Sequence, residues 1–345
     1  MDEQEIELLR ELCEAHAVSG FEDEVRDIFE RELKNYGEIG FDRLGSVYCA
    51  NHRKGPRILV AGHMDEVGFR VQTINAQGFL TFVPVGGWWG HHLLAQRVVV
   101  KTGSGEKIEG VITSRPPHFL AKADRSRVQD VGDMFIDVGA RSGEEAKEWG
   151  IEIGDPIAPD SSFTRMKSHG RFMAKAFDNR VGMALAILIG KRLLKTTSAN
   201  LVVAGTVQEE VGLRGARTLA NLLEPDYALV LEGPPADDTP GFDLTVSQGV
   251  LGEGVQIRLH DPSAILDPQL ASRAKELAYE AEIPHQVTVR SSGGTDAGIF
   301  HQSGNGVPSL VLGVPCRYIH SHQAILDGHD FSAALSLITG LVESL

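Results

Sequence analysis

Nearly continuous apolar runs alternate with helical patterns along most of the chain. The runs at 57–62, 201–206, 228–231 and 309–312 are typical of strands that are buried on both faces of a parallel or mixed sheet. Apolar residues at helical spacing predict helices over 5–15, 21–33, 181–193, 214–223, 269–282 and 331–345. Strands that alternate with helices in this way predict an α/β fold, in which helices cover a mixed sheet as an α/β/α sandwich.

The stretch from about 69 to 167 has a different pattern. Short β-rich runs occur at 70–74, 79–83, 97–101, 110–113 and 135–138, and turn-forming pairs such as Gly86-Gly87 and Pro116-Pro117 separate them at short spacing. This pattern predicts a small β domain inserted into the α/β domain. Residues 1–68 and 168–345 would then form one domain, and residues 69–167 would form the other.

Composition excludes several classes of protein. With 345 residues, 42% hydrophobic and 23% charged, the chain is long enough and apolar enough for an ordinary globular protein. Its 33 Lys and Arg against 47 Asp and Glu give a net charge of −14 with no basic stripe, so nucleic acid is not an expected partner. The longest apolar stretch, 181–190, is far short of the ~20 residues that span a bilayer, and no membrane span is expected. The acidic N-terminus lacks the features of a signal peptide, which predicts a cytoplasmic location.

Histidine and carboxylate residues follow the predicted strands, at the ends where open α/β sheets build their sites. His63 and Asp65 come directly after one strand, where an imidazole could bind a metal while the carboxylate orients it, although a lone pair of this kind more often just closes a strand. Glu209 and Glu210 come shortly after another strand. Two adjacent carboxylates at an apolar strand end are costly unless a cation or a proton compensates, whereas a solvated acidic turn is not.

Three further residues are weak signals when each is taken alone. Asp178 stands at the start of an apolar helix, where Asp is a common N-cap; Glu232 ends an apolar run; and His320 lies just beyond the last predicted strand, with His322 beside it. Together, however, five strand or helix ends on one α/β layer each supply His, Asp or Glu. Two histidines and three carboxylates suit two divalent ions about 3.5–4 Å apart, and the adjacent glutamate pair offers a spare carboxylate as a base.

The order of these motifs resembles that of the tetrahedral aminopeptidase family, which includes glutamyl and deblocking aminopeptidases within a larger clan of dinuclear zinc exopeptidases. Some relatives in this family have been labelled endoglucanases. Each motif is weak alone, but the ordered series covers essentially the whole chain and is specific. It consists of Val18-Ser-Gly-Phe-Glu-Asp-Glu-Val-Arg26, Gly62-His-Met-Asp-Glu-Val-Gly68, Gly86-Gly-Trp, Gln96-Arg-Val, Lys175-Ala-Phe-Asp-Asn-Arg180, Val207-Gln-Glu-Glu-Val-Gly-Leu-Arg-Gly-Ala216, Gly293-Gly-Thr-Asp296 and Arg317-Tyr-Ile-His-Ser321.

The resemblance implies a metal-dependent aminopeptidase that hydrolyses the N-terminal residue of peptides through a water that bridges two metals. Its five implied ligands are His63 and Glu232 on one metal, Glu210 and His320 on the other, and Asp178 between them. Glu209 would be the general base and Asp65 would orient the first histidine. The resemblance also implies a cis peptide bond after the bridging aspartate. Zn, Co and Mn all accept such a mixed ligand set, so two ions of any of the three would serve as cofactors.

The resemblance further implies that the inserted segment is a small β-barrel-like dimerisation domain, and that dimers assemble into a tetrahedral homododecamer with an internal chamber. The substrates would be peptides with a free N-terminus. Two positions depart from the family's pattern. Glu232 stands where many relatives in the wider clan have Asp, and His322 stands where relatives commonly have proline, so His322 competes with His320 as a ligand.

Three other functions fit parts of the sequence. An N-acyl amino acid deacylase or a carboxypeptidase could use the same metal centre, and the free amine or free carboxylate of its preferred substrate would identify it. An endoglucanase would use paired carboxylates without metal, which leaves the two histidines without a role. A catalytically silent assembly or binding protein would have little reason to keep the whole ligand set together with Glu209.

Overall fold

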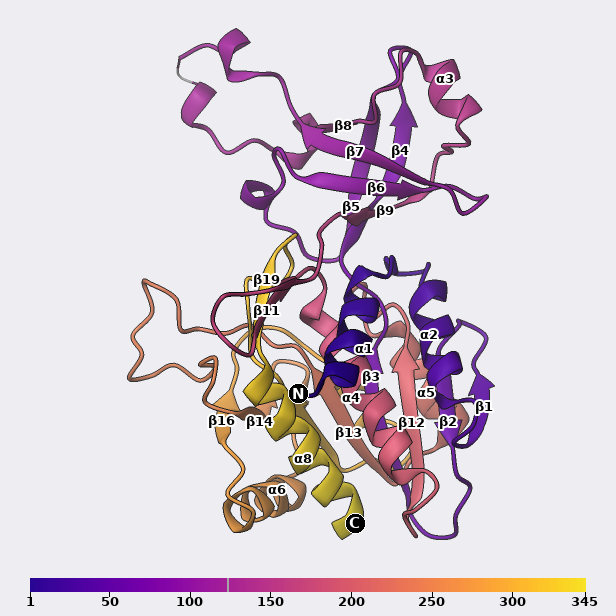
Figure 1. The fold of residues 1–345 in the computed structure, drawn as a ribbon, viewed down its shortest axis with the longest axis vertical. Helices are drawn as coiled ribbons and strands as arrows, with labels where there is room; N and C mark the ends of the chain where they lie inside the picture. Colours follow the sequence, from indigo (N-terminus) through magenta and orange to yellow (C-terminus); the bar gives the residue numbers. More distant parts are fainter. Residues whose placement is uncertain (123) are drawn as a thin grey trace.

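A mixed nine-stranded sheet forms the centre of the α/β part of the molecule (Figure 1). The fold is taken from a computed structural model that describes residues 1–122 and 124–345. The sheet contains, in order across it, β1 (Glu38–Phe41), β2 (Val47–Ala50), β12 (Asn200–Thr206), β3 (Arg57–His63), β13 (Tyr227–Glu232), β17 (Ser309–Gly313), β14 (Val255–Asp261) and β15 (Ala264–Ile265), with β16 (His285–Val289) paired to β14. Strands β12, β3, β13 and β17 run parallel to their neighbours within this group, so their carboxyl ends meet at one edge.

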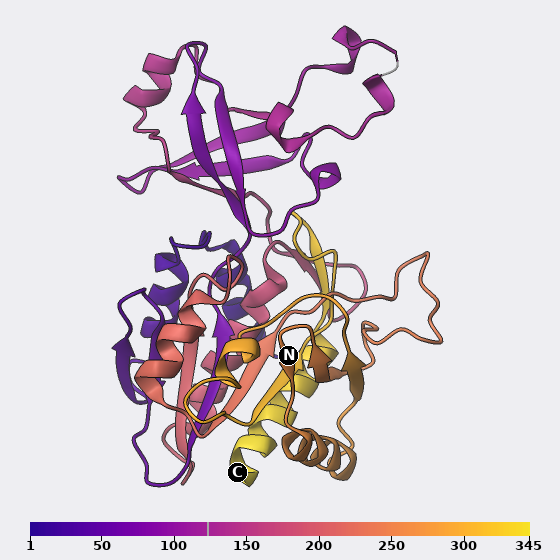
Figure 2. The same ribbon diagram turned by 180° about the vertical axis from the view of Figure 1, so that it is seen from behind.

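Helices cover both faces of this sheet. Helices α4 (Phe177–Leu193) and α8 (Gly328–Ser344) pack on one face, and α5 (Arg214–Leu223) and α7 (Ala297–Phe300) pack on the other (Figures 1 and 2). Helices α1 (Glu3–Glu14) and α2 (Asp23–Leu33) lie against α4, and α6 (Pro268–Glu280) lies against α8. The predicted α/β/α sandwich is therefore confirmed. No described helix is long and apolar enough to cross a membrane.

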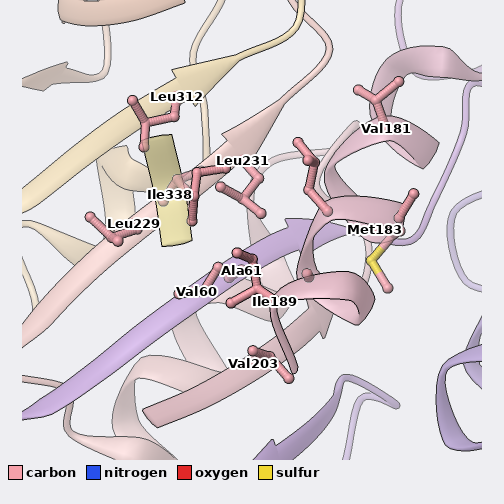
Figure 3. Close-up of a cluster of buried hydrophobic side chains, with 14 of the residues drawn as sticks. Val60, Ala61, Val181, Met183, Ile189, Val203, Leu229, Leu231, Leu312 and Ile338 are labelled. Carbon is pink, nitrogen blue, oxygen red and sulfur yellow. The ribbon is translucent and has the colours of Figure 1, made fainter. Parts of the chain in front are cut away.

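The main core lies between α4, α8 and the parallel strands (Figure 3). Its side chains are fully buried, and each one of Leu, Ile, Val or Met size stabilises the fold by about 1.5–3 kcal/mol. They include Val60, Val181, Met183, Ile189, Val203, Leu229, Leu231, Leu312 and Ile338. Because helices shield both faces, the strands can be apolar along their length, which is why their runs are visible in the sequence. This packing makes the carboxyl edge of the sheet a firm base for a site.

The inserted segment forms a closed barrel with a core of its own. Its strands, in order around the barrel, are β4 (Gly68–Ile74), β5 (Leu80–Val85), β8 (Phe135–Asp137), β7 (Lys107–Thr113), β6 (Arg97–Lys101) and β9 (Pro156–Pro159), and α3 (Gly143–Glu148) follows β8. The inserted β-barrel is therefore confirmed. The division of the chain at 1–68, 69–167 and 168–345 remains a prediction.

A small sheet lies where the barrel meets the α/β part (Figure 1). It consists of β10 (Thr164–Arg165), β11 (Arg171–Ala174), β19 (Ala324–Asp327) and β18 (Cys316–Arg317). The turn between β18 and β19 carries His320 and His322. One of the predicted ligands therefore comes from this hairpin rather than from the large sheet.

Candidate metal centre

Four of the predicted site residues follow parallel strands at the same edge of the large sheet. His63 is the last residue of β3 and Glu232 is the last residue of β13. Glu209 and Glu210 lie just after β12, whose last residue, Thr206, is the register partner of His63. Neighbouring strands of one sheet are about 4.8 Å apart, so this topology brings the four side chains together although they are far apart in the sequence.

Asp178 enters the site from a break in the backbone at the start of α4. Its φ and ψ of −82° and 101° are not helical, and the peptide bond to Asn179 is cis, as the resemblance implied. Asn179 caps the helix instead, because its Oδ1 accepts a hydrogen bond from the Gly182 N–H at 2.9 Å. Its Nδ2 also donates to the carbonyl of Leu231 at 2.7 Å. The alternative in which Asp178 serves as the N-cap is therefore wrong, and its carboxylate faces the histidines.

The His63 ring meets three carboxylates with a single nitrogen. Its Nε2 lies 3.1 Å from Asp178 Oδ1, 3.7 Å from Glu232 Oε2 and 3.9 Å from Glu209 Oε2. One ring nitrogen can donate only one hydrogen, so it cannot satisfy all three oxygens. An arrangement of this kind suits a cation placed among the four groups.

His320 forms a second group with the same aspartate. Its Nε2 lies 3.3 Å from Asp178 Oδ2 and 3.1 Å from Glu210 Oε1. The two oxygens of the aspartate therefore face two different histidines. His322 lies elsewhere: its ring is 5.6 Å from that of Trp88, and it is absent from every described group of side chains that could hold a metal.

The distances fit two cations that share a carboxylate. In each of the trios His63, Asp178, Glu232 and Asp178, Glu210, His320, one ligand atom per residue lies within 4.8 Å of the others. Ligands at about 2.0–2.2 Å from a tetrahedral ion are about 3.3–3.6 Å apart, close to the separations found here. Glu232 Oε1 is also buried without a hydrogen-bond partner among the described residues. The residues present thus fit a pair of divalent cations.

The carboxylate of Asp65 contacts residues of both trios. Its Oδ1 lies 3.4 Å from His63 Nδ1 and accepts the N–H of Glu209 at 3.0 Å. Its Oδ2 accepts the N–H of Glu210 at 3.1 Å and the hydroxyl of Ser19 at 2.6 Å. The backbone carbonyl of Asp65 also lies 3.1 Å from His63 Nδ1, so this residue orients the imidazole with its backbone and its carboxylate, and holds the backbone of the glutamate pair with the carboxylate. The contact with Ser19 was not predicted, although Ser19 lies in a stretch that carries the resemblance.

Burial dominates the electrostatics of the cluster. It raises the pKa of Glu232 to about 8 and raises the pKa of Glu209 well above its usual range, with the charge of Glu232 adding to the second shift. Burial alone lowers the pKa of His63, but the charge of Glu209 and the hydrogen bond with Asp178 outweigh it, so this pKa lies well above its usual range. The carboxylates therefore favour any positive charge among them, whether it is carried by a proton or by a cation.

A cleft of about 430 Å³ opens onto these residues. Arg258 and Arg290 also line it, together with the loop from Ser292 to Thr295. The guanidinium groups contact Asp261 at 3.2 Å and Asp237 at 2.9 Å, respectively. The Nε atom of each arginine is buried and has no hydrogen-bond partner among the described residues. Sequence reasoning missed Arg258 because it did not predict strand β14.

A buried ionic network lies next to the bridging aspartate. Glu66 contacts Lys175 Nζ at 2.8 Å and Arg180 Nη2 at 3.0 Å, and all three side chains are at most 2% exposed. Arg180 also donates to the carbonyls of Leu12 and Met64. The sequence held a signal for this network, since a lysine and an arginine bracket Asp178 in an otherwise apolar stretch.

Asp296 is a further buried carboxylate, which the sequence suggested only as part of a glycine-rich turn. Its Oδ2 accepts the hydroxyl of Thr206 at 2.5 Å, and its side chain makes no capping bond to α7. Burial raises its pKa to about 6. The residue therefore ties the glycine-rich loop to the end of β12, just before the glutamate pair.

Known proteins are similar to this chain along its length. The M42 glutamyl aminopeptidase family matches residues 45–337, and the AMPT family matches residues 3–29. The glutamyl aminopeptidase of Lactococcus lactis subsp. cremoris MG1363 is 37% identical over 344 residues, which cover 98% of this chain and 95% of that protein. The M42 match and the Lactococcus lactis match both extend over the residues of the candidate metal centre.

Solved structures agree with these matches. The TET aminopeptidase of the marine sediment archaeon Thaumarchaeota archaeon SCGC AB-539-E09 has a TM-score of 0.95 and 42% identity, over 99% of this chain and 96% of that one. The TET1 peptidase of Pyrococcus horikoshii, which can assemble into a tetrahedron or a large octahedral shell, has a TM-score of 0.88 and 32% identity over 99% and 100%. A structure from Thermotoga maritima called an endoglucanase has a TM-score of 0.79 and 29% identity over 97% and 96%.

Proposed function

The chain belongs to the M42 glutamyl aminopeptidase family and is a metal-dependent aminopeptidase, and from this premise we propose that it removes the first residue of peptides by means of two divalent cations and a glutamate base. The observation that carries the proposal is the shared carboxylate, whose two oxygens face His63 and His320 at 3.1 and 3.3 Å. A single-metal site or a pair of acid and base carboxylates would not need this bridging position.

Five residues would hold the cations: His63 and Glu232 on one, Glu210 and His320 on the other, and Asp178 on both. When bound, the cations would supply Lewis-acid polarisation of the scissile carbonyl and of the attacking water. Glu232 has one more methylene than the Asp of many relatives in the wider clan. Its carboxylate still lies within 3.7 Å of His63 Nε2.

Glu209 would move the proton. It belongs to neither of the two trios that share Asp178, although it forms a third close group with His63 and Glu210, and its Oε2 lies 3.9 Å from His63 Nε2 on the wall of the cleft. It would take a proton from the attacking water and give it to the leaving amine. Asp65 would keep the base in place through the Glu209 N–H. The free α-amino group of the substrate would enter the carboxylate-rich end of the cleft, which restricts cleavage to the first residue.

An acidic first residue fits the cleft best. Arg258 and Arg290 line it, and although each has a carboxylate partner, each keeps a buried Nε–H that no described residue accepts. The positive charge of the two guanidinium groups would attract a glutamate or aspartate side chain in the cleft, whereas a lysine side chain would meet two positive groups. The glutamyl specificity named for the Lactococcus lactis relative agrees with this preference.

The test is a panel of chromogenic amides of Glu, Asp, Leu and Lys, each with a free and with an acetylated amine, run beside a cellulosic substrate. We expect cleavage of the free-amine substrates alone, fastest for Glu and Asp, lost on chelation and restored by Zn, Co or Mn. Preferred cleavage of acetylated substrates would indicate a deacylase. Cleavage of cellulose after chelation would overturn the metal-dependent proposal as a whole.

The barrel would also make this chain an oligomer. A tetrahedron has six edges, so a shell with one dimer along each edge contains twelve chains, as the resemblance implies. The tetrahedral assembly of the Pyrococcus horikoshii relative supports the same arrangement here. Mass photometry of the purified protein should give a species of about twelve times the 37.4 kDa chain mass, and a monomer at micromolar concentration would contradict it.

A further inference from the structure

The turn after β5 brings the barrel against two of the proposed ligands. A Cβ atom built on Gly87 would lie 3.2 Å from His320 Nδ1 and 3.6 Å from its Cε1. A Cβ atom on Gly86 would lie 3.4 Å from the Cβ of Glu210 and 2.6 Å from a methyl group of Val67. The turn of Gly86 and Gly87 therefore lies close to the Nδ1 side of the His320 ring, whose Nε2 faces Asp178. Only glycine permits the approach without a shift of the neighbours.

His320 has little other support. Its φ of 55° is in the left-handed region, as is that of Tyr318 at 61°, so it lies on an irregular turn rather than on a strand. Its side chain is 33% exposed, compared with 2% for that of His63. The Asp65 carboxylate lies 3.4 Å from Nδ1 of His63, whereas Nδ1 of His320 faces the side of Gly87 on which a side chain would begin.

The turn itself is fixed by Trp88. Its indole N–H donates to the carbonyl of Gly68 at 3.0 Å, and its ring stacks on Phe69 at 4.7 Å between centroids. The same ring lies 5.6 Å from that of His322, which is 2% exposed. The tryptophan thus joins the base of the barrel to the hairpin that carries His320.

We propose that Gly87 is a positioning residue for the proposed cation site made by Asp178, Glu210 and His320. Because the turn of Gly86 and Gly87 lies against the outer side of the His320 ring, it sets the orientation of that ring and hence the affinity of this site. The inference rests on the proposed function, since it assumes that the five ligands hold two cations. Among the described residues, a Cβ atom built on Gly87 would meet only the His320 ring within 4 Å, so the other site, with His63 and Glu232, should not depend on this position.

The test uses the full-length protein and two graded variants, Gly87→Ala and Gly87→Val. Gly87 has no positive φ, so alanine is compatible with its backbone, and the added methyl would press on the ring. Gly103→Ala and Gly103→Val are the matched controls, because Gly103 lies in another turn of the same barrel and a Cβ there would meet no described atom within 4 Å. Cobalt is titrated into each metal-depleted protein and followed by its visible absorption and by calorimetry.

We expect two equivalents of cobalt in the unmodified protein and in both controls. In Gly87→Ala the affinity for one equivalent of cobalt should fall by about 10-fold, and in Gly87→Val it should fall by nearer 100-fold. The affinity for the other equivalent should stay the same. Two unchanged equivalents in both Gly87 variants would overturn the proposal. Fewer than two equivalents in the unmodified protein would instead overturn the proposed metal centre, which separates the two failures.

A second measurement needs no variant and applies if the substitutions unfold the barrel. Coupling between two sites is reciprocal, so a turn that holds the ring for the cation must itself be stabilised when the cation binds. Hydrogen exchange of the amides at 86–88 should therefore slow when the second equivalent of cobalt is added. Exchange in the turn at 103–105 should stay the same. Equal exchange at 86–88 with one and two equivalents would also overturn the proposal.

Discussion

His63 and Glu232 each end a parallel strand of the central sheet, whereas Glu210 and His320 each lie on a turn. The side chains of the first pair are 2% and 7% exposed, and Asp65 lies against the imidazole. In the second pair, the histidine is 33% exposed and lies against the inserted barrel. The comparison teaches that one half of the proposed centre depends on the packed sheet, and the other half depends on contact between two parts of the chain.

The largest effect should come from the residue that belongs to neither half. Glu209→Gln removes the proposed base but keeps a side chain of the same shape, so turnover should fall by about 10²- to 10⁴-fold while both cations remain bound. Rate measurements together with metal analysis of the same sample check this. A full turnover rate in the variant would show that proton transfer does not pass through Glu209, whatever the state of the two halves.

The next largest effect should act equally on both halves of the proposed centre. Lys175→Met leaves Glu66 with only one of its two buried cationic partners, next to the aspartate that both halves share. Removing one member of a buried ion pair costs about 3–5 kcal/mol, so the free energy of unfolding in urea should fall by about 3 kcal/mol. The matched control is Arg165→Met, which breaks an exposed pair with Glu3 and should change stability far less. Equal losses in the two variants would contradict the role of burial.

A smaller effect should distinguish the two halves of the proposed centre. It comes from a change to the residue that supports the half with His63 and Glu232. Asp65→Asn weakens the support of His63 and should reduce the affinity of its cation by about 10- to 100-fold. Because Asp65 also accepts the N–H groups of Glu209 and Glu210, the other cation should weaken too, but less. Cobalt titration measures both. Ser19→Ala, which removes only a hydroxyl donor to the same carboxylate, is the control. A larger loss at the His320 half would reverse the comparison.

The half with His63 and Glu232, here called the sheet-based half, was also the easier one to predict from the sequence. Apolar runs end at His63, near Glu209 and at Glu232, and parallel strands in one sheet must place such ends together. The role of Asp178 could not be read in this way, because Asp and Asn are equally good N-caps and only the structure shows that Asn179 takes the capping position. The bridging role was implied by the resemblance alone, and it remains a prediction.

The half with Glu210 and His320, here called the turn-based half, depends on contacts that no local sequence pattern indicates. Gly86 and Gly87 were visible as a turn signal and as part of a motif that carries the resemblance, but nothing in their spacing indicates that they meet a histidine more than 200 residues later. Arg258 was missed for a related reason. Strand β14 carries Gln256 and Arg258 as buried polar residues, so its apolar run is interrupted and does not stand out as the other central strands do.

The smallest effect concerns the segment that leads into the glutamate pair. Glu22 Oε1 accepts the N–H groups of Gly20 at 2.7 Å and of Gln208 at 3.1 Å, so it holds the backbone next to Glu209. Burial, with the charge of Asp65 adding to it, raises the pKa of Glu22 to about 7. This value lies above the value of about 4.3 in an unfolded chain. Between these two pH values the folded state keeps a proton that the unfolded state has lost, so the free energy of unfolding falls as the pH rises, and above pH 7 the loss is complete.

Glu22→Gln keeps the accepting oxygen but has no proton to lose. The variant and the unmodified protein should therefore melt together near pH 4.5, and the variant should melt about 2 °C higher at pH 8. Thermal melts of metal-depleted protein at the two pH values measure the difference, and the exposed Glu106→Gln serves as the control for a change in surface charge. A variant that melts lower at pH 8 would mean that the ionised carboxylate is favoured by its N–H donors. A gain that appears only at high pH would mean that the segment leading into Glu209 and Glu210 is held by a carboxylate whose charge destabilises the fold.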